Sequence, residues 1–288
     1  MLLIDGTNAL IRLNSAASPS CNKHEMFVRM IAKRCKQFDD WNVLVAWDIS
    51  PSQYRLALYP AYKCYTYEYV PDFVLRERHK LLNELHERVL PCVGIKSVVI
   101  EGVEADDIIA VACKHYANEP KIIISTDRDY LQLITENTSV YDPPQDAFTD
   151  AAAMLARYGV EDIAIATKLS LIEKCLVGDA SDNIKGIEGI GKEKVKRFLE
   201  GYKANAFLPQ DLELLRINKD KIDLNRQLIS LSVLPEGFQN AILARIERAV
   251  SVAQRLSDND DIVGDVVREY KLHDVKDSML KLRNWDGA

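Results

Sequence analysis

The amino-acid sequence predicts an α/β fold with a parallel sheet, followed by a helical region, and two observations support this. Over about the first 130 residues, short apolar runs alternate with segments whose apolar residues recur at helical spacing. This alternation is typical of a parallel sheet with crossover helices. After residue 150 the apolar runs stop and the helical spacing continues. We therefore expect two domains, with bounds 1–165 and 166–288.

The individual elements follow from the same patterns. Strands are predicted over the apolar runs 1–4, 43–47, 97–100 and 122–125. Runs that are apolar throughout are expected for strands buried on both faces of a sheet. Crossover helices are predicted over 25–38 and 105–117. Later helices are predicted over 150–159, with Asp150 as N-cap, and over 166–176, 192–202, 224–231 and 238–256.

Composition limits the class of protein. The chain has 288 residues, of which 48% are hydrophobic, enough to bury a substantial core. Its 6 cysteines form no C-x-x-C pair, which indicates reduced thiols rather than zinc ligands or disulfides. No signal peptide is recognised, and no apolar run approaches the ~20 residues that span a membrane. We expect a cytoplasmic protein, in the host cytoplasm if it is viral, with no membrane partner.

Carboxylates follow each of the four predicted strands. They are Asp5, Asp48, Glu104, Asp106, Asp107, Asp127 and Asp129, and Asp179 and Asp182 come later in the chain. Because the carboxyl ends of parallel strands meet at one edge of a sheet, we expect the strand-end carboxylates to lie together. An Asp after a single strand is usually a turn residue or a helix cap. Four successive strands that end in this way favour a shared site.

Clustered carboxylates repel one another unless a cation lies among them. Oxygen ligands without His or Cys suit Mg²⁺ or Mn²⁺, and so many carboxylates favour two ions, an arrangement used in phosphoryl chemistry. The formal net charge of −6 argues at first against a nucleic-acid partner. With these carboxylates set aside as metal ligands, the rest of the chain is mildly basic, so DNA and RNA are not excluded.

Residues 184–199, IKGIEGIGKEKVKRFL, have the form of a helix–hairpin–helix. Gly186, Gly189 and Gly191 would let the backbone approach a phosphate, and the next helix offers its N-terminal N–H groups. Lys192 and Lys194 add positive charge for a grip that does not depend on DNA sequence. The alternative is an ordinary glycine-rich link between helices.

Residues 55–90 form an aromatic and basic interval between the second and third strands. Its tyrosines are Tyr59, Tyr62, Tyr65, Tyr67 and Tyr69, and its cations include Arg55, Lys63, Arg76 and Arg78. Aromatic rings stack on unpaired bases while Lys and Arg follow phosphates, a combination typical of single-strand binding. The alternative is a solvated surface with no such role.

Six segments together resemble the flap endonuclease family of structure-specific 5'-nucleases. They are LLIDGTN, AWD, YPAYK, GVEADD, STDRDYLQL and GDASDNIKGIEGIG, and they extend from Met1 to about Phe198. The family includes the nuclease domain of bacterial DNA polymerase I and free-standing bacteriophage enzymes, and the chain is most similar to the bacteriophage type. The resemblance implies a PIN-like, Rossmann-like parallel-sheet nuclease core with a helical arch over about 55–90, and a C-terminal helical domain with the helix–hairpin–helix.

The resemblance also implies Mg²⁺-dependent hydrolysis of phosphodiester bonds, with Mn²⁺ able to substitute. The activities would be 5' flap cleavage and 5'-3' exonuclease action on DNA and RNA–DNA hybrids, in replication, primer removal or repair. By this resemblance the first metal lies among Asp5, Asp48, Glu104, Asp106, Asp107 and Asp127, and the second among Asp127, Asp129, Asp179 and Asp182.

Further roles are carried over from the family. The catalytic set would be Asp106, Asp127 and Lys63, with Lys63 stabilising charge on the scissile phosphate and Tyr62 stacking on a base. The residues expected to contact DNA are Arg55, Tyr62, Lys63, Arg76, Arg78, Gly186, Gly189, Ile190, Gly191, Lys192 and Lys194. A K⁺ ion could bridge the hairpin carbonyls to phosphate. The second arch cation of the family is absent, and Arg76 or Arg78 would replace it.

Two other functions fit parts of the sequence. An acidic α/β RNase acting on single-stranded RNA would use the carboxylates, but would need neither the glycine turn nor the basic interval. A non-catalytic DNA-junction-binding protein would use those two features, but bare carboxylates would weaken its binding. We expect a monomer that acts on branched DNA, with replication proteins of the host or phage as further partners.

Overall fold

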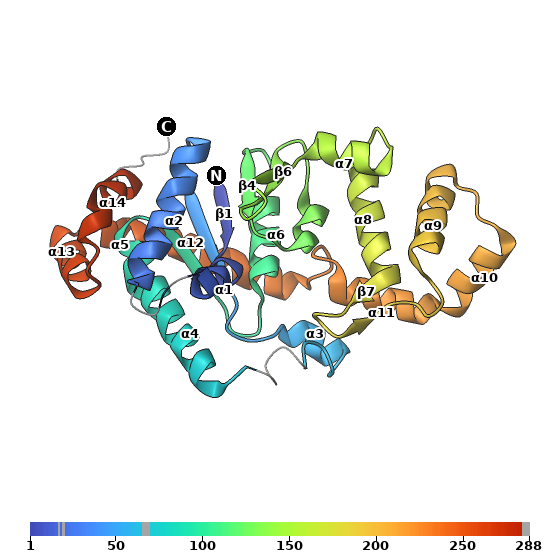
Figure 1. The fold of residues 1–288 in the computed structure, drawn as a ribbon, viewed down its shortest axis with the longest axis horizontal. Helices are drawn as coiled ribbons and strands as arrows, with labels where there is room; N and C mark the ends of the chain where they lie inside the picture. The colour runs from blue at the N-terminus through green and yellow to red at the C-terminus, as the bar shows by residue number, and fades with distance from the viewer. Residues whose placement is uncertain (17, 19–20, 65–69, 284–288) are drawn as a thin grey trace.

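The computed structural model describes the whole chain except residues 17, 19–20, 65–69 and 284–288. Its centre is a six-stranded sheet in the order β3-β2-β1-β4-β5-β6 (Figure 1). The strands are β1 (Leu2–Asp5), β2 (Val43–Trp47), β3 (Lys96–Val99), β4 (Lys121–Ile124), β5 (Thr138–Asp142) and β6 (Ala147–Thr149). All neighbouring strands are parallel except β5 and β6. The predicted α/β class with a parallel sheet is confirmed.

Each of the four predicted strands is present within one residue of its predicted bounds. Strands β5 and β6 were missed because their sequences, TSVYD and AFT, are too polar or too short to form an apolar run. A two-stranded hairpin of β7 (Gly178–Asp179) and β8 (Ile184–Lys185) was also missed. It lies within the region for which only helices were predicted.

Helices cover both faces of the sheet and its β3 edge. From the N-terminus they are α1 (Gly6–Ala16), α2 (Lys23–Phe38), α3 (Gln53–Leu58), α4 (Asp72–Glu84), the π-helix η1 (Leu85–Val89), α5 (Leu90–Cys92), α6 (Ala105–His115) and the 3-10 helix η2 (Arg128–Leu133). Then follow α7 (Ala151–Tyr158), α8 (Ile163–Val177), α9 (Lys192–Ala204), α10 (Pro209–Ile217), α11 (Lys219–Ile229), α12 (Glu236–Ser257), α13 (Asp260–Glu269), η3 (His273–Val275) and α14 (Lys276–Arg283).

The predicted helix starting after Asp150 illustrates how local sequence sets an element. The side chain of Asp150 accepts a hydrogen bond from Ala153 N at 2.8 Å, so the predicted N-cap is confirmed. At the other end Gly159 adopts φ 62° and its N–H bonds to Leu155 O. A cap at each end therefore fixes the length of α7.

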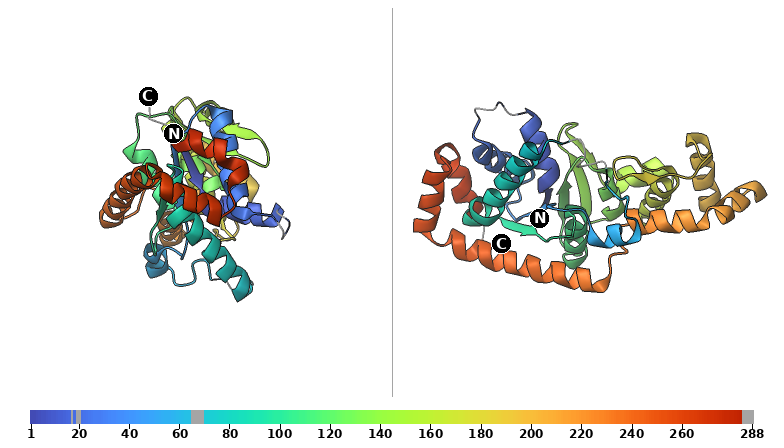
Figure 2. Two further views of the ribbon diagram at one scale, coloured as in Figure 1. Left: turned by 90° about the vertical axis from the view of Figure 1, so that its left-hand side faces the viewer. Right: turned by 90° about the horizontal axis from the view of Figure 1, so that it is seen from below.

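The helical part of the chain extends to both ends of the molecule (Figure 1). Helices α8 to α11 project away from the sheet, whereas α12 runs back along its outer side towards α13 (Figure 2). Val266 and Met279, from α13 and α14, join the same apolar core as Phe27 of α2. The division into domains 1–165 and 166–288 stays a prediction. Among the described helices, none is long and apolar enough to cross a membrane.

The register of the sheet sets the position of the predicted carboxylates. Ile4 of β1 lies between Val45 of β2 and Ile124 of β4, so these strands end at one level. The carboxylates that follow the strands therefore meet at one edge of the sheet. This edge faces α3 and the β7–β8 hairpin.

Candidate metal centre

Asp5 is the last residue of β1 and is buried. Its Oδ1 accepts from Asn8 N at 2.9 Å, and its Oδ2 accepts from Ser125 Oγ and Tyr130 OH, both at 3.1 Å. Burial and the nearby charge of Asp127 raise the pKa of Asp5 to about 6, although these hydrogen bonds act in the opposite direction. The carboxylate is therefore fixed in place, and among the described residues no cation forms an ion pair with it.

The start of α6 brings three carboxylates together. Glu104, Asp106 and Asp107 each offer an oxygen within 4.8 Å of the others, the arrangement of a possible metal site. Arg55 lies against two of them. Its Nη1 is 2.7 Å from both Glu104 Oε2 and Asp107 Oδ2, its Nη2 is 2.9 Å from Asp107 Oδ1, and its Nε donates to Leu228 O. Asp106 Oδ2 is 3.9 Å from Arg55 Nη2, the longest of these ion pairs.

The prediction that Arg55 contacts DNA is wrong in this structure. Only 2% of the residue is exposed, and its guanidinium is fully engaged by Glu104 and Asp107. A basic residue in an aromatic, basic interval looks like a surface cation, but sequence composition does not show which way a helix turns it. Even with Arg55 present, burial raises the pKa of Asp107 to about 6.

Tyr62 and Lys63 stand at the base of the predicted arch and point into the carboxylates. Tyr62 OH donates to Glu104 Oε2 at 2.8 Å and to Asp182 Oδ2 at 3.2 Å. Lys63 Nζ lies 2.5 Å from Glu104 and 3.9 Å from Asp182. Against the effect of burial, Glu104 and its neighbours hold the pKa of Lys63 well above its ordinary value. Because Tyr62 is only 2% exposed, the prediction that its ring stacks on a base is not met in this conformation.

The backbone ties this arch base to the β7–β8 hairpin. Lys63 has φ 52°, in the left-handed region, and its N–H donates to Asp182 O at 3.0 Å. Asn183, also left-handed with φ 59°, donates from Nδ2 to Ala61 O at 2.8 Å. Both residues have a strained backbone, and hydrogen bonds between the two segments hold them in it. The backbone of Lys63 is therefore held in one position, as is common at functional sites.

The second group of carboxylates gathers around Lys174, which the sequence analysis missed. Its Nζ bonds to Asp129 Oδ1 and lies 2.7 Å from Asp179 Oδ2. Burial raises the pKa of Asp129 to about 7 and that of Asp182 to about 6. For Asp179, hydrogen bonds from Lys174 and Ser181 outweigh burial and lower the pKa. The sequence signal that could have identified Lys174 is its position in the last turn of the helix that leads into GDASD.

Three predicted ligands form no ion pair with a cation among the described residues: Asp5, Asp48 and Asp127. Asp48 accepts a hydrogen bond from Ala105 N, and burial together with Asp5 raises its pKa well above the ordinary value. Asp127 is exposed and accepts from Asp129 N at 2.8 Å. A cavity of about 490 Å³ lined by Asp127, Asp129 and Asp179 opens beside them. Crowded carboxylate oxygens of this kind fit hard divalent cations.

The predicted helix–hairpin–helix is present as a tight turn leading into α9. Gly189 has φ 74°, which favours glycine, and Lys192 at the start of α9 is exposed. At Gly186 glycine is required for packing, because a Cβ there would lie 2.0 Å from Val177 O at the end of α8. Ile190 is half-buried against an apolar cluster. For Gly186 and Ile190 the structure thus gives a packing role, and their contact with DNA stays a prediction.

The rest of the predicted arch is only partly described. Arg76 and Arg78 lie on α4, Arg76 exposed and Arg78 partly so, and α4 projects from the body of the molecule (Figure 1). Tyr65, Tyr67 and Tyr69 lie outside the described residues. Tyr59 packs with Tyr62 in a small apolar cluster.

Without metal, the protein is expected to lose thermal stability as pH rises from about 4 to about 7. Asp5, Asp107 and Asp182, with pKa values of about 6, and Asp129, at about 7, bind protons more tightly in the folded state than in the unfolded state. The folded state therefore loses stability as these groups ionise. Mg²⁺ should raise Tm more at pH 7.5 than at pH 5, since ionised carboxylates bind it. Calorimetry in chelator and in Mg²⁺ at both pH values tests this, and a Tm in chelator that rises with pH would contradict it.

Comparison with known proteins places this geometry in context. The family model described as 5'-3' exonuclease, N-terminal resolvase-like domain, matches residues 1–159. A 5'-3' exonuclease of Bacillus subtilis (strain 168) is 25% identical, over 98% of this chain and 96% of that protein. Flap endonuclease Xni of Shewanella denitrificans is 29% identical, over 81% and 90%. The bacteriophage T5 flap endonuclease, in a pseudo-enzyme-product complex with DNA and metal ions, has a TM-score of 0.66 at 22% identity, covering 94% of this chain and 98% of that one. At this identity the structural likeness shows the fold.

Proposed function

Because the chain belongs to the 5'-3' exonuclease family that has the N-terminal resolvase-like domain, we propose that it is a structure-specific 5'-nuclease. Its reaction is the hydrolysis of phosphodiester bonds in flapped DNA and at 5' ends. The observation that carries this proposal is the convergence of two carboxylate groups and Lys63 at one sheet edge. That edge lies between the arch base and the hairpin that leads to α9.

The two carboxylate groups divide the proposed metal ligands. Asp5, Asp48, Asp106 and Asp127 would hold the first Mg²⁺, and Asp127, Asp129, Asp179 and Asp182 the second, with Mn²⁺ as a substitute. Glu104 and Asp107, which the sequence analysis also assigned to the first ion, pair with Arg55 in this structure. When bound, two such cations supply Lewis acidity, which activates water and neutralises charge on the phosphate. The residues fit this role since they offer only oxygens, and Lys63 and Lys174 leave several of those oxygens free.

The chain's own cations have separate tasks in this proposal. Lys63, protonated at neutral pH, would face the scissile phosphate and stabilise the negative charge that develops on it. Lys174 joins η2 to the hairpin and so brings Asp129 and Asp179 together. Arg55 neutralises Glu104 and Asp107 and orients the first turn of α6.

The turn before α9 would hold the duplex at a distance from the cut. Gly189, Gly191 and the N-terminal N–H groups of α9 present a backbone surface for phosphate, and Lys192 and Lys194 add charge. A K⁺ ion would fit at the carbonyls of this turn.

The substrates would include RNA–DNA hybrids, the active species would be a monomer, and replication proteins of the host or phage would be partners.

The proposal is tested with a labelled 5'-flap duplex and a matched single-stranded RNA. Each is incubated with the protein in Mg²⁺, in Mn²⁺ and in chelator. We expect cleavage near the flap junction in either metal and none in chelator. Asp179→Asn should retain the fold and reduce the rate by about a hundredfold or more, because the second metal loses a ligand.

The alternatives predict different products. Cleavage of the RNA alone would identify an RNase and overturn the flap substrate. Flap binding that survives chelator without any cleavage in Mg²⁺ or Mn²⁺ would identify a junction-binding protein.

A further inference from the structure

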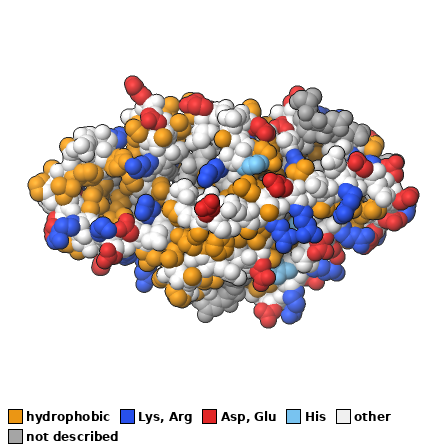
Figure 3. Space-filling model, turned by 180° about the vertical axis from the view of Figure 1, so that it is seen from behind, with side chains coloured by type: hydrophobic (Ala, Val, Ile, Leu, Met, Phe, Trp, Pro, Cys, Tyr) orange, Lys and Arg blue, Asp and Glu red, His pale blue; other side chains and the backbone are white. Residues whose placement is uncertain are grey.

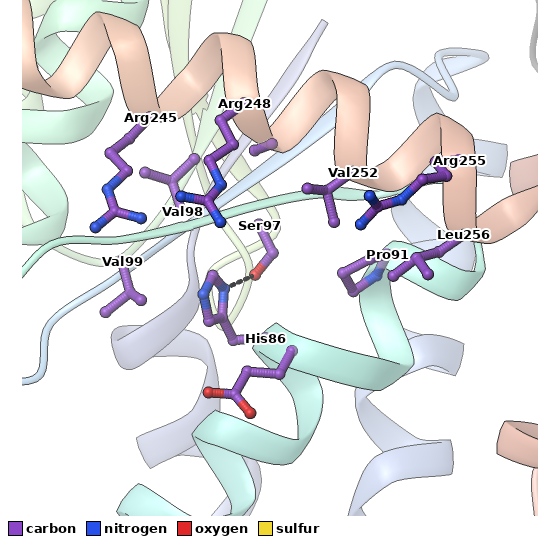
Figure 4. Close-up of a pocket in the computed structure, with 12 residues that line it drawn as sticks. His86, Pro91, Ser97, Val98, Val99, Arg245, Arg248, Val252, Arg255 and Leu256 are labelled. Atoms are coloured by element: carbon purple, nitrogen blue, oxygen red, sulfur yellow. Dashed lines mark hydrogen bonds between the residues drawn. The ribbon is translucent and has the colours of Figure 1, made fainter.

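A pocket separate from the carboxylates opens along the outer edge of the sheet. It has a volume of about 310 Å³ and lies between α12, the edge strand β3 and the η1–α5 segment (Figure 4). Strand β3 is hydrogen-bonded to β2 alone, so its other edge has no strand partner. The volume is at the lower end of the ~300–1,000 Å³ typical of ligand pockets. No part of the proposed nuclease mechanism uses this pocket.

Three arginines from one face of α12, Arg245, Arg248 and Arg255, line the pocket. Among the described residues, none of the three has a hydrogen-bond or ion-pair partner. Some other exposed arginines have an acidic partner, as Arg268 has Asp265, and some, such as Arg76 and Arg128, have none among the described residues; Arg245, Arg248 and Arg255 differ in that they line one pocket together. Three neighbouring guanidinium groups without partners, in a chain of net charge −6, indicate that the partner is an external anion. Lys and Arg side chains also gather on the face of the molecule that α12 crosses (Figure 3).

The floor of the pocket adds another hydrogen-bond donor. Trp47 Nε1 donates to Ser97 Oγ at 2.8 Å, and Ser97 Oγ lies 2.9 Å from His86 Nδ1. Trp47 can only donate, which leaves the Ser97 hydroxyl proton for His86 Nδ1 and the imidazole proton on Nε2. Burial and the charge of Arg245 lower the pKa of His86 to about 4, so the ring is neutral at pH 7. His86 thus offers a neutral N–H beside the three arginines.

The lining is not only cationic. Pro91, Val98, Val252 and Leu256 contribute apolar surface between the arginines. A phosphodiester backbone needs charge and has no side chain to place against such a surface. Acidic side chains with one apolar side chain between them match both features, since carboxylates bind arginine in bidentate pairs and the apolar group fills the gap.

We propose that this pocket binds an acidic peptide segment of a partner protein, through carboxylates on Arg245 and Arg248 and an apolar side chain against Val252 and Leu256. The site would attach the nuclease to a partner without covering the carboxylate centre. The inference does not depend on the proposed nuclease activity.

The probe is a fluorescein-labelled peptide with one apolar residue between acidic residues, Asp-Asp-Leu-Asp-Asp, and its binding to the full-length protein is followed by fluorescence anisotropy. The variant Arg245→Gln/Arg248→Gln should bind it at least tenfold more weakly, because charged hydrogen bonds are lost. The control Arg268→Gln removes a comparable exposed charge on α13 and should bind as the wild type does. A second peptide with Ser in place of the Leu should also bind several-fold more weakly.

Parallel titrations with labelled flap DNA in Ca²⁺ decide between partners. The proposal expects the double variant to keep wild-type affinity for the flap. Loss of DNA affinity without any peptide binding would make the pocket a nucleic-acid contact and overturn the proposal. Equal peptide affinity in the wild type, the double variant and the control would reveal only non-specific charge attraction and would also overturn it. Equal Tm values for the variants show that any loss of binding is not a loss of folding.

Discussion

Replacing Asp106 by Asn is expected to reduce flap cleavage about a thousandfold or more while leaving the protein as stable as the wild type. Asp106 is half-buried, its Oδ1 accepts from Asp107 N at 2.7 Å, and its Oδ2 lies 3.9 Å from Arg55, so no short ion pair competes with a metal for this carboxylate. Loss of one ligand charge removes several kcal/mol of stabilisation of the phosphate charge in the transition state. The measurement is single-turnover cleavage at saturating enzyme, alongside urea unfolding.

The neighbouring carboxylate provides the matched control. Asp107 is 1% exposed and accepts two hydrogen bonds from Arg55, at 2.7 and 2.9 Å. Asp107→Asn breaks a buried ion pair and should cost about 3–5 kcal/mol of unfolding free energy. The two substitutions would then have different effects: Asp106→Asn would reduce activity, and Asp107→Asn would reduce stability. Equal stability losses in both variants would mean that Asp106 is also a structural partner.

The clustering of carboxylates at one edge of the sheet was predictable from sequence, because it depends only on the parallel direction of the strands. A parallel strand delivers its next residue to the same edge whatever follows, so Asp5, Asp48 and Glu104 could be placed together from strand assignments. The caps of α7 were also predictable, since Asp150 and Gly159 act within a single turn. These features depend on residues close in sequence or on strand polarity.

The cations of the site could not be placed in this way. Arg55 and Lys63 reach Glu104 from α3 and the arch base, and Lys174 reaches Asp129 from α8, each across many residues of chain. The pairing of Lys174 with Asp179 is local by comparison. Composition showed that 55–90 is basic and aromatic, but not that Arg55 and Tyr62 turn inwards. The hairpin β7–β8 was missed because its strands have two residues each and depend on pairing, not on an apolar pattern.

The second large effect is expected from Arg55→Gln, which should destabilise the protein by about 3–5 kcal/mol at pH 8. The change leaves Glu104 and Asp107 buried with no compensating guanidinium. It also removes the donor to Leu228 O on the far side of the site. Urea unfolding in chelator measures the loss. Arg29→Gln, which breaks only an exposed pair with Glu25, is the control and should change stability by no more than ~1 kcal/mol.

The pH dependence of this loss identifies its cause. Burial already raises the pKa of Asp107 to about 6 with Arg55 present, and without Arg55 the folded-state pKa must rise further. A folded-state pKa above the unfolded value costs stability as pH rises through it, so the deficit of Arg55→Gln should shrink from pH 8 to pH 5. A deficit of equal size at both pH values would attribute the loss to packing and to the Leu228 hydrogen bond. A deficit that shrinks would establish Arg55 as the charge that lets the first turn of α6 hold its carboxylates together before any metal binds.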